Sequence, residues 1–344
     1  MTHFHLNMPP PSVSFAPGDV VLTGDRPTGP LHLGHLAGSL ASRLVAQAAC
    51  EQTILVADLQ ALTDHVHDPG KVRAAVVEVV RDYLAVGLDP ARTTFALQSA
   101  VPELAELTQF CAMVVGTGRA LRNPTIREEA KAKGFEDAMP LAFATYGVSQ
   151  AADILGFGAT AVPVGIDQLP MIELAQEIGR SLSRMGVAIP RPRAVYGAAG
   201  RLPGLDGRKA SKSLGNAIPL RTSASDLEGY VKRMLSDPSR TSKDDPGDPD
   251  VAVTFAHLRA FDPDREGLEG LERDYRRGGV RDADVKARTL AVLERLLSPI
   301  RNGEATPPSD SEVLDILRAG SVRAREKAAR TLASVRKAFG VFEP

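Results

Sequence analysis

The 344-residue sequence lacks several features that would assign it to a common class of protein. It has no tryptophan and only two cysteines, Cys50 and Cys111, which are far apart and form no CxxC pair. A disulfide scaffold, a zinc ribbon and an iron–sulfur centre are therefore unsupported, and free thiols fit a reducing cytoplasm. No run of about 18 apolar residues is present, so we expect no transmembrane helix and no membrane partner.

Charge of one sign and a common nucleotide motif are also missing. The 41 basic and 42 acidic residues nearly cancel, so a nucleic-acid partner would need a local basic patch. The N-terminus has no basic start followed by a long apolar core, which argues against a secretory signal and for a cytoplasmic location. The pattern GxxxxGK[ST] does not occur, so a protein that uses nucleotides would need another source of positive charge.

Short apolar runs that end in glycine or polar residues recur along the first part of the chain. They lie at residues 20–24, 54–58, 95–98 and 161–165. Such runs suit strands that are buried on both faces of a parallel sheet. Residues 72–84 instead carry apolar side chains at the spacing of one helix face. Strands that alternate with helices predict an α/β fold with a doubly wound, Rossmann-like parallel sheet.

The character of the sequence changes after about residue 218. Strand-like runs disappear, residues 236–250 read as an exposed loop, and amphipathic helices are predicted over 285–297 and 312–339, the second interrupted at Gly320. Four basic residues of the last helix share one face by helical spacing: Arg323, Lys327, Arg330 and Lys337. We therefore expect a flexible tail over 1–18, an α/β domain over 19–218 and a helical domain over 219–344.

A glycine-rich turn follows the first predicted strand and leads into a helix. Residues 23–35 contain Gly24, Gly29 and Gly34, and His32 and His35 lie three apart, on one face of the first helical turn. Such turns let a phosphate approach the backbone, and two imidazoles can donate hydrogen bonds to charge that develops at a phosphoryl group. A metal site lacks a third ligand nearby. A single histidine would more often be structural, but the pair at this position favours a nucleotide site.

A basic segment far downstream supplies the positive charge that the absent motif would have given. Lys209 and Lys212 lie three apart with Ser211 between them, and Gly204, Gly207 and Gly215 flank the segment. Two lysines can hold a pyrophosphate, and the glycines would let the segment move as a lid. Alone, such a segment is usually a solvated loop.

Taken together, the two segments resemble signatures of a known enzyme family. HLGH at 32–35 and KASKS at 209–213 are similar to the HIGH and KMSKS motifs of class I aminoacyl-tRNA synthetases, and the short chain resembles their tyrosyl/tryptophanyl branch. The resemblance implies ATP with Mg²⁺, a tRNA partner bound partly by the helical region 219–344 as an anticodon-binding domain, and a homodimer. It assigns catalysis to His32, His35, Lys209 and Lys212. It also implies a set of ATP-binding residues: Arg26, Pro27, Thr28, Gly34, His35, Gly165, Ile166, Asp167, Leu202, Lys209, Ala210, Ser211, Lys212 and Ser213.

A polar stripe on a mostly apolar helix indicates the amino-acid pocket. Tyr146, Gln150 and Asp153 follow the spacing i, i+4, i+7, and a strand ending in VPVGIDQ at 162–168 comes next. This pairing resembles tryptophanyl-tRNA synthetases. The resemblance implies that Asp153 accepts the indole N–H of L-tryptophan and that Tyr146 and Gln168 hold its ammonium and carboxylate. It also implies the remaining pocket residues, which are Leu22, Gly24, Gln150, Val162 and Val164.

The choice between tryptophan and tyrosine depends on two opposing signals. Gln150 is typical of tyrosyl enzymes, whereas Leu22 stands where those enzymes carry a tyrosine that bonds the substrate phenol. An unpaired buried hydroxyl costs about 1–3 kcal/mol, so Leu22 favours tryptophan and tRNA(Trp). His35, Arg26 and Ala210 also depart from the usual tryptophanyl pattern and resemble a divergent, second-copy branch. Tyrosine–tRNA ligase and a non-charging synthetase paralogue remain the alternatives.

Overall fold

The computed structural model describes residues 6–135, 138–196, 202–211, 214–302 and 307–342. Its centre is a sheet in which every neighbouring pair of strands is parallel, in the order β3-β2-β1-β4-β5. This confirms the expected doubly wound α/β fold. The strands are β1 (Val20–Asp25), β2 (Glu51–Val56), β3 (Thr93–Leu97), β4 (Ala161–Pro163) and β5 (Arg193–Val195).

Helices cover both faces of this sheet, which is why its strands are apolar on both sides. The apolar side chains of α4 (Pro69–Ala85) and of the segment α1 (Leu33–His35), η1 (Leu36–Leu40) and α2 (Ala41–Ala49) pack with Ile54 and Phe95. On the other face α5 (Glu103–Met113), α8 (Leu141–Gly156) and α9 (Leu169–Arg184) pack with Leu55 and Ala96. The shorter helices around them are α3 (Asp58–Leu62), η2 (Gln98–Ala100), α6 (Thr117–Leu121), α7 (Pro124–Lys133) and η3 (Ile166–Gln168).

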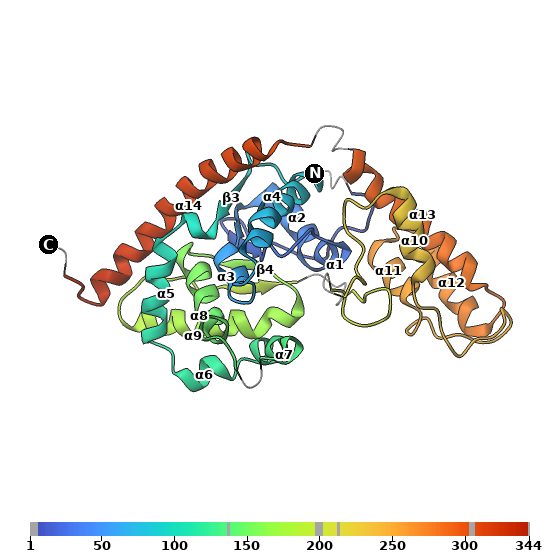
Figure 1. Ribbon diagram of the computed structural model, residues 1–344, viewed down its shortest axis with the longest axis horizontal. Coiled ribbons are helices and arrows are strands. Elements are labelled where there is room, and N and C mark those ends of the chain that lie inside the picture. The colour runs from blue at the N-terminus through green and yellow to red at the C-terminus, as the bar shows by residue number, and fades with distance from the viewer. Residues whose placement is uncertain (1–5, 136–137, 197–201, 212–213, 303–306, 343–344) are drawn as a thin grey trace.

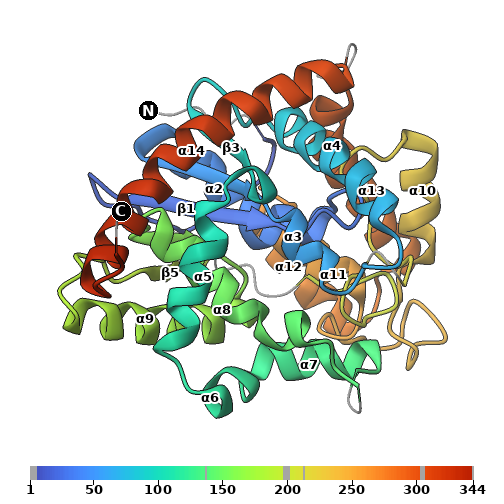
Figure 2. The same cartoon turned by 60° about the vertical axis from the view of Figure 1, so that its left-hand side comes forward.

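The order of the strands determines where a ligand can bind. The chain runs outward from β1 to β2 and β3, and then returns to place β4 on the other side of β1. In open α/β sheets the crevice for ligands lies at this reversal, outside the carboxyl ends of the strands. Residues that follow β1 and β4, the strands on either side of this reversal, are therefore brought together. Figure 2 shows β1 at the middle of the molecule, with α8 and α9 below it.

The last helix, α14 (Asp310–Ala338), is continuous and contacts the edge strand β3 as well as α4, α5 and α8 (Figure 1). The predicted interruption at Gly320 is wrong. A Cβ at Gly320 would lie 1.8 Å from the carbonyl oxygen of Phe95, so glycine is the residue that lets the helix approach the strand. Ser321 then accepts the backbone N–H of Leu97 at 3.0 Å. The helix thus covers an edge of the sheet that would otherwise present unpaired backbone groups.

The helical region 219–344 is therefore not a separate unit in space. Its first helices, α10 (Ala224–Arg233), α11 (Val253–Phe261), α12 (Arg265–Arg277) and α13 (Asp282–Asn302), lie together at one end of the molecule (Figure 1). Their apolar residues continue the core of the α4 side, whereas α14 belongs to the body around the sheet. The predicted boundary at 218/219 marks a change in the composition of the sequence. It does not separate α14 from the helices and the strand against which it packs.

Several residues between 6 and 15, within the segment expected to be a loose tail, pack against the body of the protein. Leu6 and Met8 are buried in the core shared with α4, and Val13 and Phe15 pack beside Val21. In the described part of the chain, no helix combines the length and apolarity required to cross a bilayer.

Candidate active site

The two histidines of the first motif cap the helix that they begin. The N–H of Gly34 donates to Nδ1 of His32 at 3.1 Å, and the N–H of His32 donates to Nδ1 of His35 at 3.1 Å. An accepting ring nitrogen carries no proton, so each neutral ring holds its proton on Nε2. The ring centroids are 3.9 Å apart. The predicted pairing of the histidines on one helical turn is thus confirmed, and both rings can donate through Nε2.

Gly34 lies where this motif meets the basic segment. A Cβ at Gly34 would lie 2.8 Å from Cε1 of His32 and 3.8 Å from Cβ of Ala210. The basic segment therefore lies beside the histidine turn, although about 175 residues separate them in the sequence. This proximity is what a site shared by the two motifs requires. Gly24, in contrast, faces the neighbouring strand, because its Cβ would lie 2.3 Å from the carbonyl oxygen of Leu55.

The described residues 202–211 are organised around the buried side chain of Asn216. Asn216 accepts the N–H of Ser211 at 2.8 Å and donates to Asp206 and to the carbonyl oxygen of Lys209. A Cβ at Gly204 would collide with the Asn216 amide, so Gly204 is a packing position and not a free hinge. Gly207 and Gly215 do adopt positive φ. Lys212 and Ser213, which were predicted to bind ATP, lie outside the described residues.

Lys209 faces the end of β4 across this site. Its Nζ lies 3.9 Å from Oδ2 of Asp167, and both side chains are partly exposed. The backbone of Asp167 is held by a hydrogen bond from the hydroxyl of Thr125 at 2.8 Å. The other residues predicted to bind the nucleotide differ in exposure. Pro27 and Leu202 are buried, Thr28 and Gly165 are partly exposed, and Ile166 is exposed.

A buried ion pair supports the histidine turn from below. Arg43 on α2 contacts Asp25 at the end of β1, with 2.6 Å between Nη1 and Oδ2, and Tyr83 donates to the same oxygen at 2.7 Å. Burial alone would raise the pKa of Asp25, but the charge and hydrogen bond of Arg43 and the hydrogen bond from Tyr83 hold it well below its usual range. The cluster thus keeps a fixed negative charge beneath His35.

A second buried carboxylate joins the two motifs. Asp82 on α4 accepts the backbone N–H of Leu31, just before the histidines, and the Nε of Arg221 at 2.6 Å, just after the basic segment. A backbone pairing between His32 and Pro219 runs beside it. The two motifs are therefore joined by backbone hydrogen bonds and by a shared carboxylate.

The polar end of the expected amino-acid pocket is Asp153 on α8. Its Oδ2 accepts from Nε2 of Gln98 at 2.9 Å, whereas its buried Oδ1 has no hydrogen-bond partner among the described residues. Burial raises the pKa of Asp153 to about 7, although the hydrogen bond from Gln98 lowers it. An orphaned buried acceptor costs about 1–3 kcal/mol, so the position suits a ligand that brings an N–H donor.

The walls of this pocket are apolar. Leu22 on β1, Val162 on β4 and Val164 just after β4 are buried and belong to one cluster with Ala152 of α8. Thus the structure brings Leu22, Val162 and Val164 to the same core as the helix that carries Asp153. Such an arrangement accommodates a flat apolar ring with one polar edge.

Arg26 and Tyr146 belong to a charged network beside the pocket. The hydroxyl of Tyr146 donates to Glu129 at 3.2 Å, and Arg26 contacts both Glu129 and the buried Asp64. Tyr146 is buried, and its pKa is raised by burial and by the charge of Glu129. The ATP-binding role expected for Arg26 stays a prediction, since its side chain contacts carboxylates here.

Gln150 and Gln168 are partly exposed and loosely held. Nε2 of Gln168 donates to Asp167 at the long distance of 3.4 Å. Gln150 lies one turn before Asp153 on α8. Their roles toward an amino acid stay predictions.

Sequence reasoning missed Gln98 and the Asp25–Arg43–Tyr83 cluster. Gln98 had a signal, because it is the polar residue directly after the buried strand β3. The carboxylate and guanidinium of Asp25 and Arg43 had none, since only the fold brings positions 18 apart into contact.

Comparison with known proteins agrees with this geometry. A family model described as tRNA synthetases class I (W and Y) matches residues 19–298. The chain therefore belongs to this family of class I tRNA synthetases.

Relatives narrow the assignment within the family. A tryptophan–tRNA ligase of Clostridium longisporum is 46% identical over 331 residues, which cover 94% of this chain and 97% of that protein. A tryptophan–tRNA ligase of Streptococcus mutans is 43% identical, with 94% and 98% covered. A structure of tryptophanyl-tRNA synthetase from Campylobacter jejuni complexed with ADP and tryptophan has a TM-score of 0.78 at 27% identity and covers 94% of this chain and 100% of that one. The chain is thus placed among the tryptophanyl-tRNA synthetases.

Proposed function

We propose that this protein is a tryptophan–tRNA ligase, which activates L-tryptophan with ATP to tryptophanyl-adenylate and pyrophosphate and then transfers the amino acid to tRNA(Trp). The observation that carries the choice of amino acid is the orphaned Oδ1 of Asp153 among apolar walls. Indole has one N–H on an otherwise apolar ring. A phenol would bring a hydroxyl to Leu22, which cannot bond it.

In the first step the tryptophan carboxylate attacks the α-phosphorus of ATP, and pyrophosphate leaves. His32 and His35 donate through Nε2 to the oxygens of the α-phosphoryl group, where charge increases in the transition state. Lys209, with Lys212, takes up the charge on the departing pyrophosphate. In the second step the terminal ribose hydroxyl of the tRNA attacks the adenylate carbonyl and releases AMP.

The support for this division of work is geometric. The histidine turn and the Lys209 segment meet at Gly34 and Ala210, and Asp82 accepts both the backbone N–H of Leu31 and the side-chain Nε of Arg221. Tyr146 and Gln168 remain the candidates for the ammonium and carboxylate of the substrate. We expect Mg²⁺ to enter with ATP and to be held by phosphate oxygens and water.

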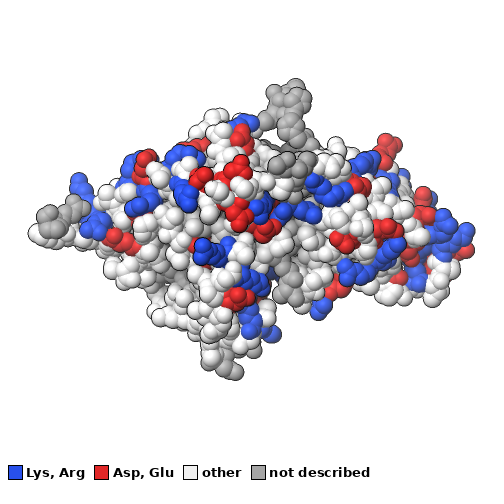
Figure 3. Space-filling view, turned by 45° about the horizontal axis from the view of Figure 1, so that its top comes forward, with Lys and Arg blue, Asp and Glu red and all other residues white. Residues whose placement is uncertain are grey.

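The tRNA would contact the helical end of the molecule, in the cytoplasm. Arg273, Arg276 and Arg277 on α12 are candidates for phosphate contacts, although Arg276 already contacts Asp250 and Glu272. Basic and acidic side chains alternate over the face in Figure 3, so this face would offer tRNA scattered contacts and not one broad positive patch. A homodimer is proposed from family membership.

The test is amino-acid-dependent exchange of pyrophosphate into ATP, run with each standard amino acid and followed by charging of tRNA. Tryptophan alone should support both reactions. Exchange with tyrosine in place of tryptophan would contradict the amino-acid assignment, and no exchange with any amino acid would indicate a non-charging paralogue.

A further inference from the structure

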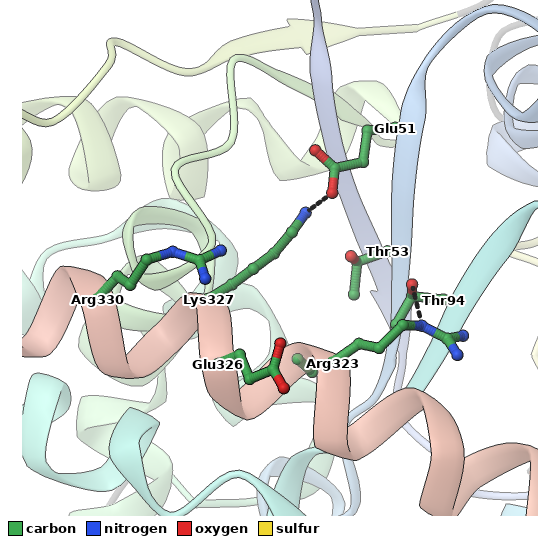
Figure 4. Close-up of a pocket in the computed structure, with 8 residues that line it drawn as sticks. Glu51, Thr53, Thr94, Arg323, Glu326, Lys327 and Arg330 are labelled. Carbon is green, nitrogen blue, oxygen red and sulfur yellow. Dashed lines mark hydrogen bonds and ion pairs between the residues drawn. The ribbon is translucent and has the colours of Figure 1, made fainter.

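A charged cavity lies under α14, away from the site described above. It has a volume of about 210 Å³, is open to solvent, and is lined by Glu51, Thr53 and Thr94 near the amino ends of β2 and β3 and by residues of α14 (Figure 4). The expected nucleotide and amino-acid residues follow the carboxyl ends of the strands, so this cavity is at the opposite edge of the sheet.

The two threonines that line the cavity lie on adjacent strands of the sheet. Thr53 and Thr94 are register partners on adjacent parallel strands and therefore point to the same face. Thr53 is 3% exposed, and its side chain lies at the centre of the cavity in Figure 4. A buried threonine at the start of a strand thus presents a polar group to the cavity.

Most basic residues of α14 already have acidic partners. Arg318 contacts Asp315, Arg325 contacts Glu103, Arg336 contacts Glu106, and Lys327 reaches across the cavity to Glu51. Two arginines differ. Arg323 makes one long contact of 3.4 Å from Nε to the hydroxyl of Thr94, and Arg330 has no ion-pair partner within the described ranges.

We propose that this cavity binds phosphate groups through Arg323 and Arg330, with the hydroxyls of Thr53 and Thr94 as further donors. Guanidinium groups present paired N–H donors that match phosphate oxygens. The lining carries three cations and two carboxylates, Glu51 and Glu326. Lys327 neutralises Glu51, so Glu326 is the carboxylate of the lining that would repel an anion bound by the two arginines.

The spacing along the helix indicates the size of the ligand. Positions 323 and 330 are seven residues apart, and a rise of 1.5 Å per residue separates them by about 10 Å along the axis. A single phosphate would contact one arginine, whereas a diphosphate or a run of backbone phosphates reaches both. The shared chemistry is an extended phosphate anion, either free or carried by RNA.

The test uses the whole enzyme with Lys209→Ala, which weakens phosphate binding at the proposed catalytic site. Pyrophosphate is titrated by calorimetry into this protein with and without Arg323→Gln and Arg330→Gln. Removing two charge-assisted contacts should weaken pyrophosphate binding by about tenfold or more. Arg318→Gln on the same helix, which removes a paired and exposed arginine, is the matched control and should change nothing.

A second arm distinguishes the source of the phosphate. Filter binding of tRNA at fixed salt is measured with the same arginine variants in the otherwise native chain. Weaker tRNA binding with no calorimetric binding of pyrophosphate identifies RNA phosphates as the ligand. The proposal is overturned if neither ligand is weakened, or if Arg318→Gln has an equal effect. Tryptophan-dependent exchange should stay unchanged in the arginine variants, so this result is independent of the proposed activity.

Discussion

At the scale of single residues, Asp153 and Gln98 would form the polar edge of the proposed amino-acid pocket. Oε1 of Gln98 accepts the N–H of Gln60 at 3.0 Å, which fixes the amide so that its Nε2 donates to Asp153. Consequently only Oδ1 of Asp153 remains to accept from a ligand. The sequence predicted Asp153 through a family resemblance, but the orientation of its oxygens depends on Gln98, which lies in η2 directly after β3.

This geometry predicts that tryptophan affinity depends on pH. Oδ2 of Asp153 already accepts from Gln98, so a proton taken up below the pKa of about 7 goes to Oδ1, which then can no longer accept the indole N–H. Affinity should fall by about tenfold for each pH unit below 7. Because the chain has no tryptophan, the fluorescence of the ligand reports binding directly.

Asp153→Asn is the control for this pH dependence. The variant should bind tryptophan weakly and with the same affinity at pH 6 and pH 8, because an asparagine amide does not ionise near neutral pH. A native enzyme whose affinity stays constant over this range would contradict the assigned role of Asp153.

Lys209 gives a second residue-scale prediction. Lys209→Ala should lower the rate of pyrophosphate exchange by about 10²–10³-fold, because the substitution removes the positive charge that stabilises the leaving pyrophosphate. Tryptophan affinity should change little. Arg208→Ala, whose guanidinium contacts the exposed Asp206, is the matched control and should retain most of the rate. If Lys209→Ala exchanges pyrophosphate as fast as the native enzyme, Lys209 does not take part in the mechanism as proposed.

At the scale of elements, the close approach of α14 to β3 shows why the prediction at Gly320 failed. Glycine in a helical pattern reads as a break, because it weakens an isolated helix. Here its missing side chain lets the helix contact strand backbone, and that neighbour is not visible in the sequence. Four of the five strands of the described sheet were predicted, since burial on both faces leaves an apolar run in each; β5 was not, because it is three residues long and begins with the exposed Arg193.

Gly320→Ala should therefore destabilise the protein, by about 1–3 kcal/mol from overpacking. Gly229→Ala on α10 is the matched control, because its Cβ would meet nothing within 4 Å, and it should stabilise by about 0.5–1 kcal/mol. The free energy of unfolding in urea measures both. Equal effects of the two substitutions would mean that α14 does not contact β3 as described.

At the scale of the whole molecule, α14 is needed by the body around the sheet although it comes last in the chain. Ala324, Ala328 and Leu332 are buried in the same core as α5 and α8. A chain that ends at residue 302 should therefore aggregate or elute as an expanded species in size exclusion, whereas one that ends at residue 340 should behave like the full chain. A compact, active product of the first truncation would contradict this dependence.

The same scale limited what could be predicted about domains. The change in composition near residue 218 is real, because β-strands end and α10–α13 follow. However, composition cannot show that a later helix returns to an earlier layer. The proposed site could be inferred from the sequence where motifs indicate it, at His32, His35 and Lys209, whereas the contact between the distant positions Asp25 and Arg43 could not.

The most direct test of the central claim compares tryptophan with its benzothiophene analogue, in which sulfur replaces the indole N–H. Both rings fill the same apolar pocket, but only tryptophan can donate to Oδ1 of Asp153. The native enzyme should bind tryptophan about tenfold or more tightly than the analogue, and Asp153→Ala should bind the two almost equally. If the native enzyme fails to discriminate, or if the preference persists in Asp153→Ala, the indole N–H is not held by Asp153.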